Sequence, residues 1–95
     1  MAISVSLVDA DTYEVVVGGG RPGSTETTHR VHMSQAYYRT LCAGTVTHEW
    51  VLVQSFRFLL EREPNTAILR EFDLPVIGEY FPEYEREMRA RLGVR

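Results

Sequence analysis

The glycine-rich segment at residues 18–24 comes closest to a named chemical motif. Gly18, four further residues, Gly23 and then Ser24-Thr25 reproduce the glycine spacing of a phosphate-binding P-loop. In that motif a lysine reaches the phosphates and a helix N-terminus cradles them. Here Ser24 occupies the lysine position, and the residues that follow have strand composition. We therefore predict a flexible hairpin loop rather than a nucleotide site.

The histidines and the cysteine are the candidate metal ligands. His29 and His32 are three residues apart in a predicted strand, so their side chains should point to opposite faces. His48 lacks the second histidine, four residues on, of a zinc-protease helix, because Leu52 occupies that position. A site joining Cys42, His48 and one strand histidine is conceivable, but no spacing encodes it. The favoured interpretation is surface or capping histidines, with no metal and no cofactor.

Other residue types that serve in catalysis have simpler explanations. Asp9 and Asp11 alternate on one face, but a third cation ligand is not identifiable and a turn is favoured. Cys42 is expected near a helix C-terminus, where the dipole raises a thiol pKa, so it is predicted to be a small core residue. No serine has a glycine-flanked elbow beside it. We predict no catalytic residue and no enzyme activity.

The composition is that of one small globular domain covering all 95 residues. The net charge of −3 argues against general binding of nucleic acid or of anionic membranes. All ten basic residues are arginine, which a GC-rich genome explains. A single cysteine, no signal peptide and no apolar run long enough to span a bilayer together predict a cytoplasmic protein without a membrane segment.

Hydrophobic patterning predicts the elements that position these residues. Alternation and β-branched composition predict three strands, at residues 3–8, 12–17 and 25–33, joined as an antiparallel meander. Helical spacing, caps and prolines predict helices at residues 35–42, 47–63, 66–72, 75–80 and 83–92. The fold class is therefore α+β: the meander comes first, followed by one long central helix and two to three shorter helices packed on one sheet face.

The central helix at residues 47–63 has more apolar surface than one buried face requires. Its main stripe comprises Leu52, Val53, Phe56, Leu59 and Leu60. Val51 and Phe58, seven residues apart, form a second apolar strip, and Trp50 projects toward the polar face. Such a helix either lies between two layers or keeps one strip for a partner.

The second half of the chain carries a resemblance. It contains Phe58-Leu59-Leu60-Glu61-Arg62-Glu63-Pro64 and then Phe72-Asp73-Leu74-Pro75, followed by Tyr80-Phe81-Pro82-Glu83-Tyr84-Glu85. Together with the strand-rich first part, this is similar to a group of small bacterial single-domain proteins of unknown function. The resemblance implies a bacterial, single-domain protein and no activity or site residue.

The aromatic content predicts a non-catalytic interaction or self-association module, expected to be a homo-oligomer. Aromatic residues among arginines are typical anchors of protein interfaces, and an uncapped strand edge adds a pairing surface. We expect these interface residues: Trp50, Val51, Phe58, Tyr80, Phe81 and Tyr84. The competing interpretation is that several short helices bury all these rings.

Two alternative functions remain open. The first is a small-ligand-binding regulatory domain with a pocket near residues 65–82, whose polar candidates are Arg70, Asp73, Glu79 and Tyr80. The second is a nucleic-acid-associated regulator that uses the C-terminal residues Arg86, Arg89, Arg91 and Arg95. Interleaved glutamates cancel much of that basic field, which disfavours nucleic acid as a partner.

Overall fold

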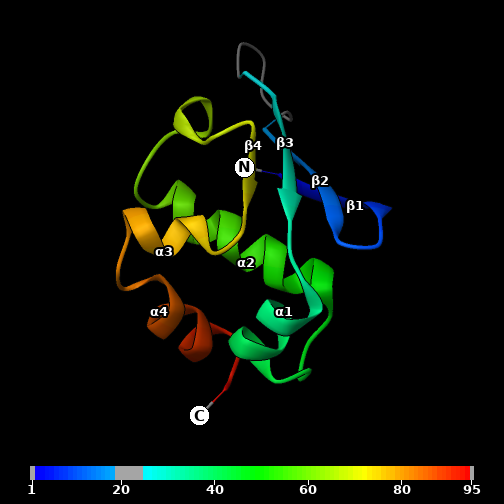
Figure 1. Cartoon of the computed structure of the whole chain (residues 1–95). Helices are drawn as coiled ribbons and strands as arrows, with labels where there is room; N and C mark the ends of the chain where they lie inside the picture. Colours follow the sequence, from blue (N-terminus) through cyan, green and yellow to red (C-terminus); the bar gives the residue numbers. More distant parts are fainter. Residues whose placement is uncertain (1, 19–24, 95) are drawn as a thin grey trace.

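The computed structural model describes residues 2–18 and 25–94. It is an α+β fold (Figure 1). The elements in chain order are β1 (Ile3–Asp9), β2 (Thr12–Val17), β3 (Thr27–His32), α1 (Gln35–Cys42), α2 (His48–Leu60), the 3-10 turn η1 (Asn65–Ala67), β4 (Glu71–Asp73), α3 (Val76–Tyr80) and α4 (Tyr84–Arg91). Of the predicted flexible loop at residues 18–24, residues 19–24 lie outside the described residues.

The sheet has four strands in the order β1-β2-β3-β4 (Figure 1). The first three form the predicted antiparallel meander. Alternate side chains of β2 and β3 are buried, including Tyr13, Val15, Val17 and Val31, so one face of the sheet contributes to the core. The β-branched and aromatic composition of these strands suits such a half-buried pleated surface.

The fourth strand corrects the predicted helix at residues 66–72. β4 pairs in parallel with β3, and only η1 is helical in that region. The Arg30 backbone N–H donates to the Arg70 carbonyl at 2.7 Å, and the Leu74 N–H donates to the His32 carbonyl at 2.9 Å. These partners lie about forty residues away in the sequence, so local periodicity did not reveal them.

Helix α2 lies between the sheet and a layer formed by α1, α3 and α4 (Figure 1). Thr47 caps it, accepting the Trp50 N–H at 3.1 Å, and it ends at Leu60 rather than at the predicted Glu63. Toward the sheet, the Phe56 ring lies 5.4 Å from the His29 ring. On the other side, the Phe58 ring lies 5.2 Å from the ring of Tyr84 in α4. The second strip is therefore internal, and the main stripe is buried except at Val53 and Leu60, which are partly exposed.

The outer helices match the prediction within a residue at each end. α1 is capped by Ser34, whose hydroxyl oxygen accepts the Tyr37 N–H at 3.1 Å. α4 rests on the core through Tyr84 and Met88, with Leu92 just beyond its end. Each helix that the structure describes is too short or too polar to cross a lipid bilayer.

Gly18, at the end of β2, occupies a position that requires glycine. Its φ is +115°, and an added Cβ would lie 2.8 Å from the Thr25 carbonyl oxygen. We expect Gly18→Ala to lower the free energy of unfolding by about 1–3 kcal/mol, measured by urea denaturation. The matched control is Gly78→Ala in α3, where an added Cβ meets nothing within 4 Å. Equal effects of the two substitutions would contradict this prediction.

Candidate functional site

The predicted interface residues divide into a buried and an exposed set. Val51, Phe58 and Tyr84 are fully buried inside the domain, so they belong to the core of the folded chain and not to its surface. Trp50 is 41% exposed and Tyr80 is 66% exposed, and Phe81 is partly buried. The burial of the first three corrects the expectation that the second strip of α2 is reserved for a partner.

A hydrogen bond explains how the polar ring of Tyr84 is accommodated in the core. The hydroxyls of Ser55 and Tyr84 lie 2.7 Å apart, and the Ser55 hydroxyl reaches the Val51 carbonyl at 2.8 Å. Burial raises the pKa of Tyr84, so the phenol stays neutral at physiological pH. The Tyr84 ring therefore has a structural role between α2 and α4.

The free edge of β1 is the first candidate binding surface. From Ile3 to Val8 the strand contains no charged residue and no proline, which are the usual protections of a sheet edge, and its charged residue, Asp9, is the last one. Leu7 is 61% exposed and Val8 is 44% exposed. The opposite edge is different, because β4 has only three residues and two of them, Glu71 and Asp73, are charged. Only the β1 edge is therefore open to pairing.

The backbone of β1 shows which of its groups face outward. The Gly18 N–H donates to the Ala2 carbonyl at 3.0 Å, and the register pairs Ser4 with Val16 and Ser6 with Glu14. In an antiparallel pair the hydrogen-bonded residues alternate with those whose N–H and C=O point away. The backbone groups at positions 3, 5 and 7 therefore point to the free edge.

The solvent-facing stripe of α2 runs beside this edge. Helix α2 packs against β1, and a shallow depression is shared by Ile3, Arg57 and Leu60. Trp50 precedes Arg57 by seven residues in α2, and the Arg57 guanidinium lies 5.5 Å from the centre of the Trp50 ring. We call the following residues together the edge surface: Ile3, Val5, Leu7, Trp50, Arg57 and Leu60.

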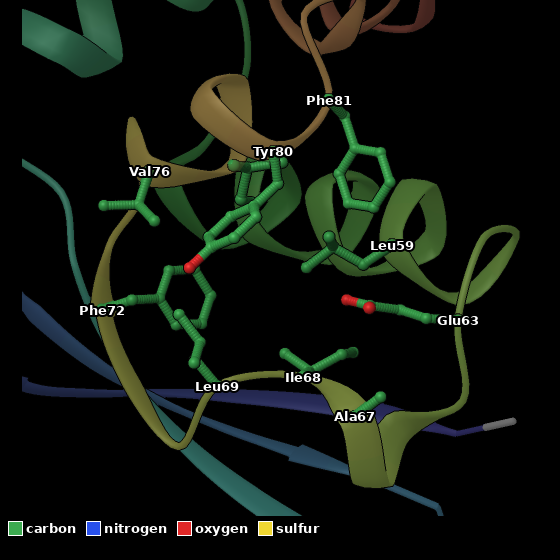
Figure 2. Close-up of a pocket in the computed structure, with 10 residues that line it drawn as sticks. Leu59, Glu63, Ala67, Ile68, Leu69, Phe72, Val76, Tyr80 and Phe81 are labelled. Carbon is green, nitrogen blue, oxygen red and sulfur yellow. The ribbon is translucent and has the colours of Figure 1, made fainter.

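A pocket between α2, η1, β4 and α3 is the second candidate site (Figure 2). Its volume is about 180 Å³. Nearly all of its lining side chains are apolar or aromatic: Leu59, Ala67, Ile68, Leu69, Phe72, Val76, Ile77, Tyr80 and Phe81. The lining also includes Glu63, whose carboxylate points into the pocket (Figure 2).

The pocket overlaps residues 65–82, where the alternative function of a ligand-binding domain placed one, but its polar residues differ from those predicted. Tyr80 lines it, whereas Arg70, Asp73 and Glu79 do not. Sequence reasoning missed Glu63, because that residue was assigned to the last turn of the central helix. The helix ends at Leu60, and Pro64 follows Glu63 directly, so Glu63 belongs to a connection that folds back over the pocket.

The two strand histidines point to opposite faces of β3, as expected. His29 is fully buried: its Nδ1–H donates to the Leu69 carbonyl at 2.7 Å, and its Nε2 lies 2.8 Å from the Thr27 hydroxyl. His32 faces the outer side, with Nδ1 3.0 Å from the Thr12 hydroxyl and Nε2 2.8 Å from a Glu71 carboxylate oxygen. From both faces, the two histidines tie the segment around β4 to β3.

A buried amide completes the polar network around His29. The Asn65 side-chain N–H₂ donates to the Thr25 carbonyl at 2.8 Å and the Thr27 hydroxyl at 3.1 Å. Burial lowers the pKa of His29, the Leu69 carbonyl opposes this shift, and the Arg70 charge adds to the lowering. His29 is therefore held neutral inside the domain.

The remaining candidates for chemistry also have internal partners. The His48 ring stacks on Tyr38 at 3.8 Å, and its Nε2 lies 2.8 Å from the Gln35 side-chain oxygen. Cys42 is a buried free thiol, as predicted for a core residue. Asp9 ends β1 at a register shift, and the Asp11 carbonyl accepts the Met33 N–H at 2.8 Å. These contacts are typical of turns and of side-chain packing within a domain.

Two of the four C-terminal arginines, Arg89 and Arg91, are engaged in contacts within the domain. Arg91 binds the Glu61 carboxylate at 2.5 Å, and this contact lowers the pKa of Glu61 and raises that of Arg91. Arg89 donates to the Thr40 carbonyl at 3.1 Å. Arg86 is exposed, and Arg95 lies outside the described residues. This use of Arg91 weakens the case for a nucleic-acid surface at the C-terminus.

No family model, no curated protein and no solved structure matches the chain. The resemblance to small bacterial proteins of unknown function therefore stays a prediction. The functional argument has to come from the edge surface and the pocket themselves.

Proposed function

We propose that this domain is a non-catalytic self-association module that forms a two-fold dimer through the β1 edge. The observation that carries the proposal is the outer edge of β1, which has no charged residue from Ile3 to Val8 and exposes Leu7 and Val8. An open edge of this kind is a template for pairing with another strand. In this proposal the module works in a bacterial cytoplasm, where a reducing environment keeps the single buried thiol free.

The strand is complementary to a second copy of itself. With antiparallel pairing centred on Val5, Ile3 of one copy lies opposite Leu7 of the other, and Ser4 lies opposite Ser6. Every such pair joins residues of the same face, so the apolar side chains remain toward the helices. Positions 3, 5 and 7 also carry the outward-pointing backbone groups, so the hydrogen-bonding pattern and the side-chain pattern agree.

The exposed stripe of α2 supports the same partner. A strand added beside β1 would direct its inward side chains toward Arg57 and Leu60, which line a depression together with Ile3. In a two-fold dimer this surface on each copy faces its equivalent, as an isologous interface requires. Tryptophan and arginine are the residue types most enriched among energetically important interface residues, and Trp50 stacks with Arg57 here.

The test is the mass of the protein in solution, measured by size-exclusion chromatography with light scattering over a range of concentrations. The wild type is expected to dimerise. Leu7→Lys is expected to weaken dimerisation at least about 10-fold, because each lysine would lose hydration opposite an apolar side chain. Since Leu7 is exposed in the isolated domain, this variant should remain folded by circular dichroism.

The matched control is Tyr80→Lys, which changes an exposed large side chain distant from the β1 edge. It should leave the dimer intact. A wild-type protein that stays monomeric at every concentration would overturn the proposal, as would a Leu7→Lys variant that dimerises as well as the wild type.

A further inference from the structure

We propose that the pocket between α2, η1, β4 and α3 is a binding site for a small organic amine: a protonated amino group on a compact apolar body. Glu63 also borders the depression beside Ile3, whereas the other residues that line this pocket do not, so the proposal does not depend on dimerisation. Three features of the pocket define the ligand class: its size, its apolar walls and the single carboxylate that enters it.

The size limits the ligand to a small molecule. The volume of about 180 Å³ lies below the range of about 300–1,000 Å³ typical of pockets for drug-sized ligands. One aromatic ring or branched alkyl group with a short chain fills such a space. The walls formed by Ile68, Phe72 and Ile77 are apolar and largely buried, and they would desolvate that group.

The charge of the ligand follows from Glu63. Its side chain is half-buried, and its carboxylate lies between the apolar side chains of Leu59 and Ile68 (Figure 2). No ion pair among the described residues includes Glu63. A carboxylate in apolar surroundings favours a cationic partner that can donate hydrogen bonds, and an ammonium group does both.

The neighbouring arginines do not supply that cation. Arg62 points to the other side of the chain, where its guanidinium lies 3.6 Å from the centre of the Phe58 ring and binds Glu87 at 2.7 Å. Arg57 lies over Trp50. The two arginines that precede Glu63 most closely in the chain therefore have other partners, and the pocket carboxylate is open to a ligand.

The opposite end of the pocket suits an uncharged group. The Tyr80 hydroxyl lies across from the Glu63 carboxylate, with apolar side chains between them (Figure 2). Tyr80 and Leu69 are 66% and 47% exposed, so they form the mouth of the pocket. A ligand would place its amino group at Glu63 and its apolar body against Phe72, below this mouth.

The experiment uses phenethylamine as the probe, with 2-phenylethanol and phenylacetate as neutral and anionic controls of similar shape. Each is titrated into the ¹⁵N-labelled 95-residue chain and followed by ¹H–¹⁵N correlation spectra. Phenethylamine is expected to bind with a millimolar to submillimolar Kd, a range set by its few non-hydrogen atoms. The shifted resonances should belong to residues 59–81, and the two controls should bind at least about 10-fold more weakly.

Two variants assign the binding to the pocket. Glu63→Gln should weaken phenethylamine binding about 10- to 100-fold, because it removes a charge-assisted hydrogen bond. Ala67→Trp should abolish binding by filling the pocket, and since Ala67 is exposed the domain should still fold. The control is Glu79→Gln, which removes an exposed carboxylate from α3 outside the pocket lining and should leave the Kd unchanged.

Several outcomes would overturn the proposal. These are equal binding of the amine, the alcohol and the carboxylate, an unchanged Kd in Glu63→Gln, and shifts confined to residues outside 59–81. An absence of any saturable shift up to about 20 mM probe, well above the Kd expected from ligand size, would do so as well.

Discussion

Phe58→Ala should lower the free energy of unfolding by about 3–5 kcal/mol, the cost typical of removing a large aromatic side chain from a packed core. Phe58 is fully buried at the centre of the contact between α2 and the outer helices. Its ring packs edge-on against Tyr84 at 5.2 Å and Phe81 at 5.9 Å. The Arg62 guanidinium covers it at 3.6 Å, so the substitution also removes a cation–π contact.

Urea denaturation followed by circular dichroism measures this effect. Because small domains have only about 5–15 kcal/mol of total stability, Phe58→Asp should leave the chain largely unfolded. The matched control is Trp50→Ala, which truncates a larger ring in the same helix at an exposed position and should cost about 1 kcal/mol or less in the monomer. If Phe58→Ala unfolds at the same urea concentration as the wild type, Phe58 is not part of the core described above.

Acidification from pH 7.5 to 5.5 should destabilise the domain through His29. The pKa of His29 is lowered in the folded state by burial, while in the unfolded chain it returns to its ordinary value near 6.5. Below pH 6.5 the unfolded chain therefore binds more protons at this position than the folded one. Stability from His29 is fully present above the unfolded pKa and is lost as the pH falls below it.

The coupling between proton binding and folding limits how much stability His29 protonation can remove. One group contributes at most about 1.4 kcal/mol per pH unit between its folded and unfolded pKa values. Protonation has a structural cost because the Nε2 atom lies 2.8 Å from the Thr27 hydroxyl, which itself accepts the Asn65 amide. A proton on Nε2 would reverse that hydrogen bond, so the Thr27 hydroxyl hydrogen would lose its acceptor inside the domain.

Urea midpoints at several pH values compare the wild type with His29→Gln. The variant should be less stable at pH 7.5, and its midpoint should fall less between pH 6.5 and 5.5. His32→Gln is the control, because His32 lies on the outer face of the same strand, paired with Glu71, and is partly exposed. A slope in His29→Gln equal to that of the wild type would show that another group carries the pH dependence.

The two proposed sites include side chains that are not buried in the core. All but two of the predicted interface aromatics lie wholly or partly inside the domain, and the exposed Trp50 and Tyr80 border different surfaces. Trp50 belongs to the edge surface and Tyr80 to the mouth of the pocket. The Leu7→Lys and Ala67→Trp variants therefore test independent features, because Ala67 lines the pocket and not the depression beside Ile3, and each should leave the other property unchanged.

Local sequence patterns determined most of the secondary structure. The alternation of residues 3–8 and 12–17 and the β-branched third segment predicted the antiparallel meander, because period-two patterning reports a half-buried strand directly. Ser34 predicted the start of α1, and Thr45 or Thr47 that of α2, where Thr47 is the cap, since capping depends only on nearby residues. The opposite orientation of His29 and His32 also followed from strand geometry alone.

Tertiary structure decided the features that depend on distant partners. Residues 71–73 form a strand because the backbone of β3 pairs with them, although their local pattern favoured a helix. Phe58 and Tyr84 are core residues because α4 packs over α2 and supplies a second buried layer, and the sequence alone left that layer and a partner surface as equal alternatives. The pocket and its carboxylate also required the fold, since Glu63 approaches Phe72 and Tyr80 only when the chain turns back after α2.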